Sequence, residues 1–169
     1  MSRLLAPVAI VVVIAWITLV VTAPHLPSSL AAFIYAFGSI VCHQRPERSF
    51  HFAGAQLPVC ARCLGIYAGA AFGLVVAQGW RVSRARRALQ SSVGRVLFFG
   101  PAIAISVAAL PTTITLVVEW TGLWNPGNLI RAAAAAILGA GVAAVVVTLH
   151  YDECTPRRPI ASSPRRPPI

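Results

Sequence analysis

The segment LGIYAGAAFGLVVAQGW, residues 64–80, carries no charged side chain along its 17 residues. Its length is close to the roughly 20 apolar residues that an α-helix needs to cross about 30 Å of hydrocarbon. Gly65, Gly69 and Gly73 recur at every fourth position and so lie on one helix face, and this spacing of small residues lets two helix backbones approach closely in lipid. The segment predicts a membrane-spanning helix with a second helix packed against its glycine face.

Three further apolar segments have the length of a membrane-spanning helix. They comprise residues 4–23, 96–118 and 129–150, and only the last holds a charged residue, Arg131. Across the chain 57% of residues are hydrophobic and 11% are charged, whereas soluble proteins contain about half and about a quarter. We therefore predict an all-α membrane protein, a bundle of four transmembrane helices. The small residues of 132–143 predict that the fourth helix packs on the glycine face of the second.

The first apolar segment also allows another interpretation, because it ends in the residues Val21, Thr22 and Ala23, which suit signal-peptide cleavage. Its apolar length exceeds the roughly 7 to 15 residues usual for a signal peptide. This length favours a retained anchor.

A shorter apolar stretch, residues 28–41, precedes the cysteine-rich segment. About twelve apolar residues are too few to cross the hydrocarbon layer, so they predict an interfacial or re-entrant helix. This helix would deliver Cys42 and His43 to the membrane surface.

Arginine supplies all 14 basic residues and predicts the orientation. Short loops rich in basic residues stay in the cytoplasm. The basic residues cluster in the 81–95 loop and in the Pro/Arg-rich tail, and both should be cytoplasmic; the 42–63 loop then faces the exterior of a multi-pass protein of the cell membrane. We expect residues 1–153 to form the transmembrane helical domain and 154–169 to be a disordered tail. Because we assign the basic charge to topology, we expect the lipid bilayer as a partner and no nucleic acid.

The exterior loop, CHQRPERSFHFAGAQLPVCARC, collects three of the four cysteines and two of the four histidines in 22 residues. Three cysteines and one histidine, Cys42, His43, Cys60 and Cys63, suit tetrahedral zinc, or iron as another thiophilic metal. His51 is an alternative to His43. The same C-x-x-C pair can exchange disulfides in an oxidising compartment, with Cys42 as the third thiol. A structural bridge from Cys42 to Cys60 or Cys63 would leave one thiol unpaired.

Ionisable residues near the outer surface form a second group. Glu119 closes the third apolar segment and Arg131 lies at the start of the fourth. Charges at membrane depth are costly and indicate function, with a partner expected. The two can pair as a structural staple, or join Arg48 and Arg62 around the cysteines as catalytic residues. A carboxylate beside a metal can activate water, and arginines favour phosphate or carboxylate groups, which predicts an anionic or lipid substrate.

The strings CHQ, P-x-R-S-F and G-x-Q-x-P-V-C-A-R-C-x-G-I-Y-x-G resemble an uncharacterised family of prokaryotic integral membrane proteins, domain of unknown function 2085. The resemblance continues at Glu119 to Gly122 and in N-L-I-R at 128–131, and it spans residues 35 to 145. Leu64 stands where we associate threonine with the family, and Glu119 where aspartate is more familiar. The resemblance implies family membership but no activity. The matching positions are Cys42, His43, Gln44, Pro46, Arg48, Ser49, Phe50, Gly54, Gln56, Cys60, Arg62, Cys63, Gly65, Tyr67, Gly69, Glu119, Asn128 and Arg131.

The sequence thus predicts an integral membrane protein with an outward-facing metal site. The metal would be structural, or it would support chemistry on an anionic or lipid substrate. Two alternatives stay open: a membrane thiol-disulfide oxidoreductase that uses Cys60 and Cys63 with Cys42, and a non-catalytic assembly partner that uses the small-residue helix faces. The pattern leaves open whether the protein is an enzyme.

Overall fold

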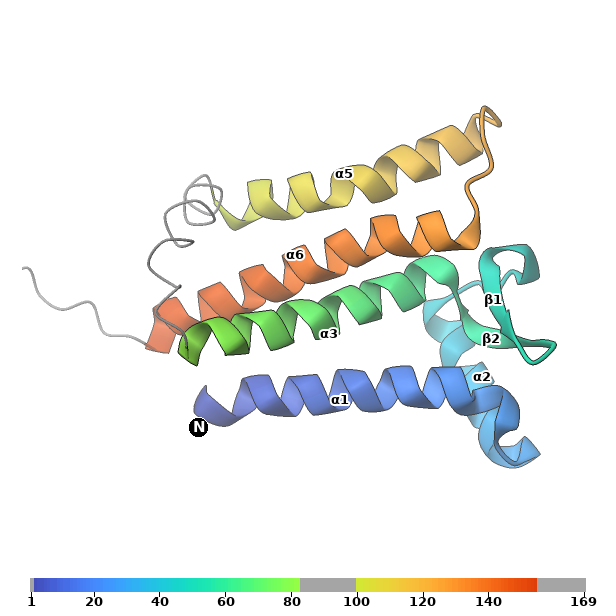
Figure 1. The fold of residues 1–169 in the computed structure, drawn as a ribbon, viewed down its shortest axis with the longest axis horizontal. Helices are drawn as coiled ribbons and strands as arrows, with labels where there is room; N and C mark the ends of the chain where they lie inside the picture. Colours follow the sequence, from blue (N-terminus) through green and yellow to red (C-terminus); the bar gives the residue numbers. More distant parts are fainter. Residues whose placement is uncertain (1, 83–99, 155–169) are drawn as a thin grey trace, which may run out of the picture.

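Four long helices run side by side in the computed structural model, which describes residues 2–82 and 100–154 (Figure 1). They are α1 (Ser2–Thr22), α3 (Ala61–Val82), α5 (Pro101–Trp120) and α6 (Asn128–Cys154). Among the described residues, three segments are long and apolar enough to cross a membrane: Pro7–His25, Pro101–Trp120 and Asn128–Val147. The apolar segment Ala61–Ala77 of α3 is shorter. The prediction of a mostly helical membrane protein is confirmed.

The glycine face of α3 packs on α6, as the sequence predicted. A methyl group added at Gly65 would overlap with the carbonyl oxygen of Ala132, and one at Gly69 with that of Ala136. From the opposite side, Gly139 of α6 meets the carbonyl oxygen of Ile66 in the same way. The two backbones are therefore as close as small residues permit.

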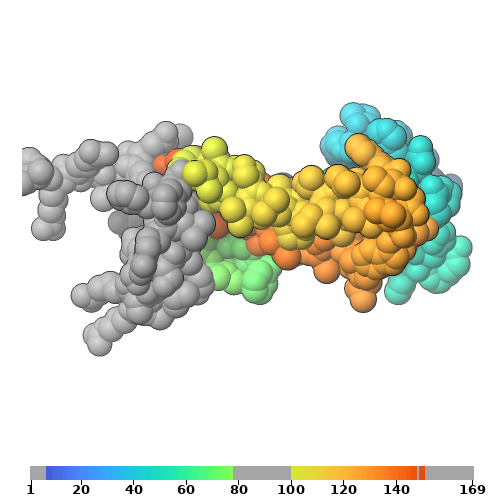
Figure 2. Space-filling model, turned by 90° about the horizontal axis from the view of Figure 1, so that it is seen from above, coloured from blue at the N-terminus to red at the C-terminus, as the bar shows by residue number. Residues whose placement is uncertain are grey.

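The other two long helices flank this central pair. On α5, the Thr112 hydroxyl donates a hydrogen bond of 3.1 Å to the carbonyl of Ala134 on α6. On α1, the Trp16 ring meets Tyr67 of α3 edge to face, with centroids 6.3 Å apart. The outer face of α5 (yellow in Figure 2) exposes apolar side chains at helical spacing, as contact with lipid requires. These side chains are Ile103, Val107, Leu110, Ile114 and Val117.

The remaining described elements gather at one end of the bundle (Figure 1). After α1 come a short 3₁₀ turn η1 (Ala23–His25) and α2 (Ser28–Val41), which is the short helix that the sequence predicted. A second 3₁₀ turn, η2 (Pro46–Arg48), leads into strands β1 (Ser49–Phe52) and β2 (Ala55–Cys60). The predicted 81–95 loop and the 154–169 tail lie almost wholly outside the described residues.

The antiparallel hairpin of β1 and β2 was not predicted, because we expected a loop. Its turn consists of Ala53 and Gly54, whose φ angles are +49° and +81°, as the commonest two-residue hairpin turn requires at both positions. Ser49 pairs with Cys60 and Phe52 with Ala55, with an irregularity between Ser49 and His51. The hairpin brings the start of the cysteine-rich segment back to its end.

Two glutamine side chains fasten the hairpin to α2. The Gln44 amide donates hydrogen bonds of 2.8 Å to the carbonyls of Tyr35 and Pro58. The Gln56 amide donates one of 2.6 Å to the carbonyl of Gln44, and the Tyr35 hydroxyl donates to the carbonyl of Gln56. These hydrogen bonds join α2, the segment that follows it and strand β2, so the hairpin is held in place against α2.

Candidate functional site

Three cysteines from three different elements meet at the N-terminal end of α3. Cys42 follows α2, Cys60 ends β2, and Cys63 lies in the first turn of α3. Their sulfur atoms all lie within 4.8 Å of one another, and all three cysteines are free. Because Ala61 begins the helix directly after Cys60, no loop separates the strand thiol from the helix thiol.

The sulfur cluster has an apolar wall. Cys42 packs with the buried side chains of Val20 and Val59, and Trp16 and Tyr67 adjoin this core. Shielding from water strengthens any electrostatic interaction of the sulfurs. The cluster therefore faces α1 and the inside of the hairpin.

Local donors favour the thiolate form of Cys60, whereas the hydrogen bond with Cys60 and burial raise the pKa of the Cys63 thiol. The Cys60 amide donates a hydrogen bond of 3.1 Å to the Cys42 sulfur. A hydrogen bond from the Cys63 side chain is the main reason why the pKa of the Cys60 thiol falls to about 5, although burial works in the opposite direction. Thiolates, not thiols, act as nucleophiles and metal ligands, so this arrangement suits either role.

The spacing of the sulfurs is compatible with a shared metal ion. Metal–sulfur distances of about 2.3 Å in a tetrahedron separate the sulfurs by about 3.8 Å, a separation within the 4.8 Å limit observed. His43, the predicted fourth ligand, is exposed and is not a member of the close group, and His51 is exposed as well. Among the described residues, the close group therefore consists of the three cysteine sulfurs alone.

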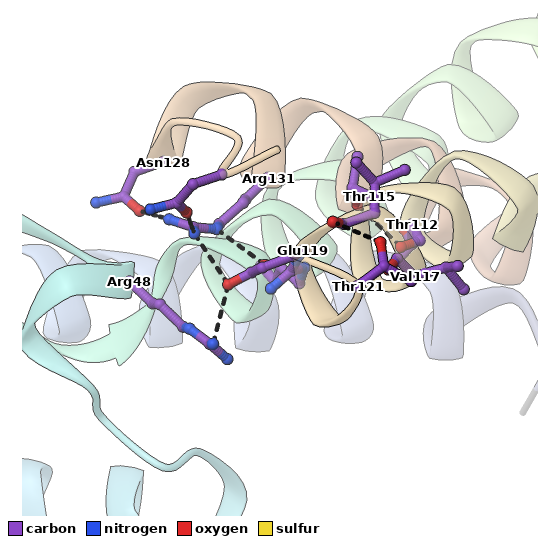
Figure 3. Close-up of polar contacts among 11 residues, drawn as sticks. Arg48, Thr112, Thr115, Val117, Glu119, Thr121, Asn128 and Arg131 are labelled. Atoms are coloured by element: carbon purple, nitrogen blue, oxygen red, sulfur yellow. Dashed lines mark hydrogen bonds and ion pairs between the residues drawn. The ribbon is translucent and has the colours of Figure 1, made fainter. Parts of the chain in front are cut away.

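The second site is built around Glu119, near the end of α5. Its carboxylate contacts Arg48 at 3.0 Å, Arg62 at 2.7 Å and Arg131 at 3.0 Å. The Glu119 side chain is 7% exposed, and those of Arg131, Arg62 and Arg48 are 5%, 13% and 29% exposed. Figure 3 shows Arg48 and Arg131 reaching the carboxylate from different sides. One carboxylate thus joins η2, α3, α5 and α6.

Arg131 also organises the connection between α5 and α6. It donates hydrogen bonds of 2.8 Å to the side-chain oxygen of Asn128 and of 2.6 Å to that of Asn125. Asn128 in turn donates to the carbonyl of Ser49 at 2.9 Å, which ties the hairpin to α6. The ion pair that the sequence suggested between Glu119 and Arg131 is present, within a larger network.

The start of α3 lies between the two clusters. Cys63 packs toward α1, whereas the neighbouring Arg62 extends to Glu119 on α5. Adjacent residues on a helix point about 100° apart, which separates the two sites. The sequence suggested that the arginines converge on the cysteines; in the structure their contacts run to Glu119. The roles of Gln44 and Gln56 were missed, and the only signal for the hairpin was Gly54 in its turn.

Known proteins resemble this region. A family model described as a predicted membrane protein (DUF2085) matches residues 42–145, which include both clusters. An uncharacterized protein of Methanocaldococcus jannaschii is 49% identical over 43 residues, 25% of this chain and 28% of that protein. An uncharacterized protein of Methanothermobacter thermautotrophicus is 60% identical over 30 residues, 18% of this chain and 27% of that protein. The matched segments therefore span about a quarter of the length of these curated relatives. No solved structure matches the chain.

Proposed function

The chain belongs to the DUF2085 family of predicted membrane proteins, and from that premise we propose that it binds one thiophilic metal ion, zinc or iron, at the membrane surface. The ligands are the thiolates of Cys42, Cys60 and Cys63. The observation that carries the proposal is that three free thiols from separate elements lie within 4.8 Å of one another.

The surroundings of the sulfurs support metal binding. Glutamine side chains fasten the hairpin that ends in Cys60 to α2, the helix that Cys42 follows, so the protein itself fixes the positions of these two cysteines. The Cys60 amide points at the Cys42 sulfur, and such donors stabilise bound thiolates. Three protein ligands with an open fourth position are typical of zinc sites that take a water or a substrate. His43, on the exposed stretch after Cys42, remains the predicted fourth ligand.

We further propose that α3 is the second of four membrane spans. Its 22 residues give a helix about 33 Å long, and it packs between α1 and α6, which both contain segments of spanning length. The arginines that follow α3 and those of the tail would then lie in the cytoplasm. This orientation puts the metal site on the exterior face of the cell membrane.

The metal would support the exterior scaffold, or act as a Lewis acid on an anionic or lipid substrate at its open position. The catalytic assignments of Glu119, Arg131, Arg48 and Arg62 remain predictions. The contacts of Glu119 favour a role as the counter-ion of the arginines, because a carboxylate shared by three guanidinium groups is a weak base.

Elemental analysis of the protein purified in detergent tests the proposal. We expect about one zinc or iron per chain, and less than a tenth of that in Cys60→Ser, because two sulfurs cannot replace three. His43→Ala is the matched variant: retained metal would show that the three thiolates suffice, and lost metal would identify His43 as the fourth ligand. A wild-type protein without metal after expression in metal-supplemented medium would refute the proposal.

The second candidate function is thiol-disulfide exchange, which the lowered pKa of Cys60 favours. Cys60 would be the attacking thiolate, and Cys63 or Cys42 the resolving thiol. Metal-free protein whose free-thiol count falls by two on oxidation, and recovers on reduction, would support it. The assembly alternative loses its basis in the glycine face, because α6 already fills that face.

A further inference from the structure

We propose that Arg48 and Arg62 bind a phosphate group at the outer end of the bundle. The first reason is a charge imbalance. Three guanidinium groups surround the single carboxylate of Glu119, and two positive charges are left over. None of these four side chains is more than 29% exposed. Charges removed from water are costly unless they are paired, so binding of a further anion would stabilise the cluster.

The unused hydrogen-bonding capacity lies on two of the three arginines. Arg131 donates to Glu119, Asn125 and Asn128 through Nε, Nη1 and Nη2, so its guanidinium group is committed. Among the described residues, the side chains of Arg48 and Arg62 form ion pairs only with Glu119, through Nη2. The Nε atom of Arg62 is buried and has no hydrogen-bond partner in this part of the chain. Buried N–H groups in folded proteins are normally paired, and an oxyanion would pair this one.

The spacing of the two arginines suits a phosphate group. Both Nη2 atoms contact the same carboxylate, at 3.0 and 2.7 Å, so the two guanidinium groups are neighbours. Their N–H groups that do not face Glu119 could donate charge-assisted hydrogen bonds to two oxygens of one phosphate. The planar guanidinium fork matches phosphate oxygens in pairs. Arg48, the most exposed of the set at 29%, leaves the group reachable from the surface.

The same chemistry can come from a lipid headgroup or from a soluble phosphate compound. Two exposed tryptophans follow Glu119: Trp120, the last residue of α5, is 76% exposed, and Trp124, in the connection after α5, is 51% exposed. Tryptophans of this kind lie at the level of lipid headgroups. The phosphate site uses none of the metal ligands and does not depend on the proposed metal.

Two binding measurements test the proposal on the full chain. In a sugar-headgroup detergent, which contains no phosphate, calorimetric titration with inorganic phosphate reports on a soluble ligand. Native mass spectrometry after addition of phosphatidylglycerol reports on a lipid headgroup. We expect saturable binding in one of the two, weakened at least tenfold in Arg48→Gln. The matched control is Arg45→Gln, which removes the same charge from an exposed arginine three residues away and should bind as the wild type does.

Binding of inorganic phosphate that Arg48→Gln abolishes supports the proposal with a soluble ligand. Retention of phosphatidylglycerol alone, again lost in Arg48→Gln, supports it with a lipid. No binding of either by the wild type overturns it, and so does an equal loss in Arg45→Gln, since nonspecific attraction would then suffice. If Arg48→Gln does not fold, Arg48→Lys is the substitute variant, because it keeps the positive charge beside Glu119 but lacks the planar guanidinium group. We expect it to bind phosphate or phosphatidylglycerol severalfold more weakly than the wild type does.

Discussion

Replacing Glu119 by glutamine removes one negative charge without changing the size of the side chain, and it leaves three arginines facing one another. The ion pairs lost measure 2.7 to 3.0 Å. Removing one partner of a buried ion pair costs about 3 to 5 kcal/mol. Because Arg48 is partly exposed and water will replace some of the lost interaction, we expect about 3 kcal/mol. For a chain of this length such a loss lowers the Tm by roughly 6 to 12 °C.

Tryptophan fluorescence of the detergent-solubilised protein measures this Tm. Glu47→Gln is the control, because Glu47 is 63% exposed and lies 4.0 Å from Arg45. Exposed pairs of this kind contribute little, so its Tm should change by less than about 2 °C. A Glu119→Gln protein as stable as the Glu47→Gln protein would refute the view that Glu119 is the counter-ion that holds the arginines together.

Three further predictions concern other parts of the molecule. Gly69→Ala should lower the Tm by several degrees, because the added methyl group overlaps with the carbonyl of Ala136. Gly127→Ala is the control and should have the Tm of the wild type, since nothing lies within 4 Å of its added carbon. Equal changes of Tm in the two variants would contradict the close contact of α3 and α6. In metal-free protein the Cys60 pKa of about 5 keeps Cys60 a thiolate above that pH, so its alkylation rate should be flat from pH 6 to 8. A rate that rises about tenfold per pH unit would indicate an ordinary thiol. Gln44→Ala removes the hydrogen bonds that the amide donates to the carbonyls of Tyr35 and Pro58, which should lower the free energy of unfolding by about 1 to 3 kcal/mol. The hairpin should then become a site of limited proteolysis. A hairpin as resistant as in the wild type would show that the amide is dispensable.

The helices were predictable because their signals are local. A membrane requires uninterrupted apolar segments, so the approximate positions of the long helices follow from composition, and the four-residue repeat from Gly65 to Gly73 identified the partner face. The membership of three cysteines in one site was also predictable, because residues flanking a short helix and a C-x-x-C pair can meet at the same membrane surface.

The hairpin and the separation of the two sites were not predictable in this way. A strand of four to six residues with a mixed burial pattern gives little periodicity, and amide side chains that bond distant carbonyls leave no mark on spacing. The position of Glu119 relative to Arg62 depends on how α3 and α5 are rotated about their own axes. That rotation is set by packing against α6, which no single segment encodes.

Strand β2 passes into α3 without an intervening residue, so the hairpin and the helix are joined directly at Ala61. The side chains of Cys63 and Arg62 leave the same first turn of α3 in different directions. A ligand that displaced this turn on one side would also displace the group on the other side, and such an effect would be mutual.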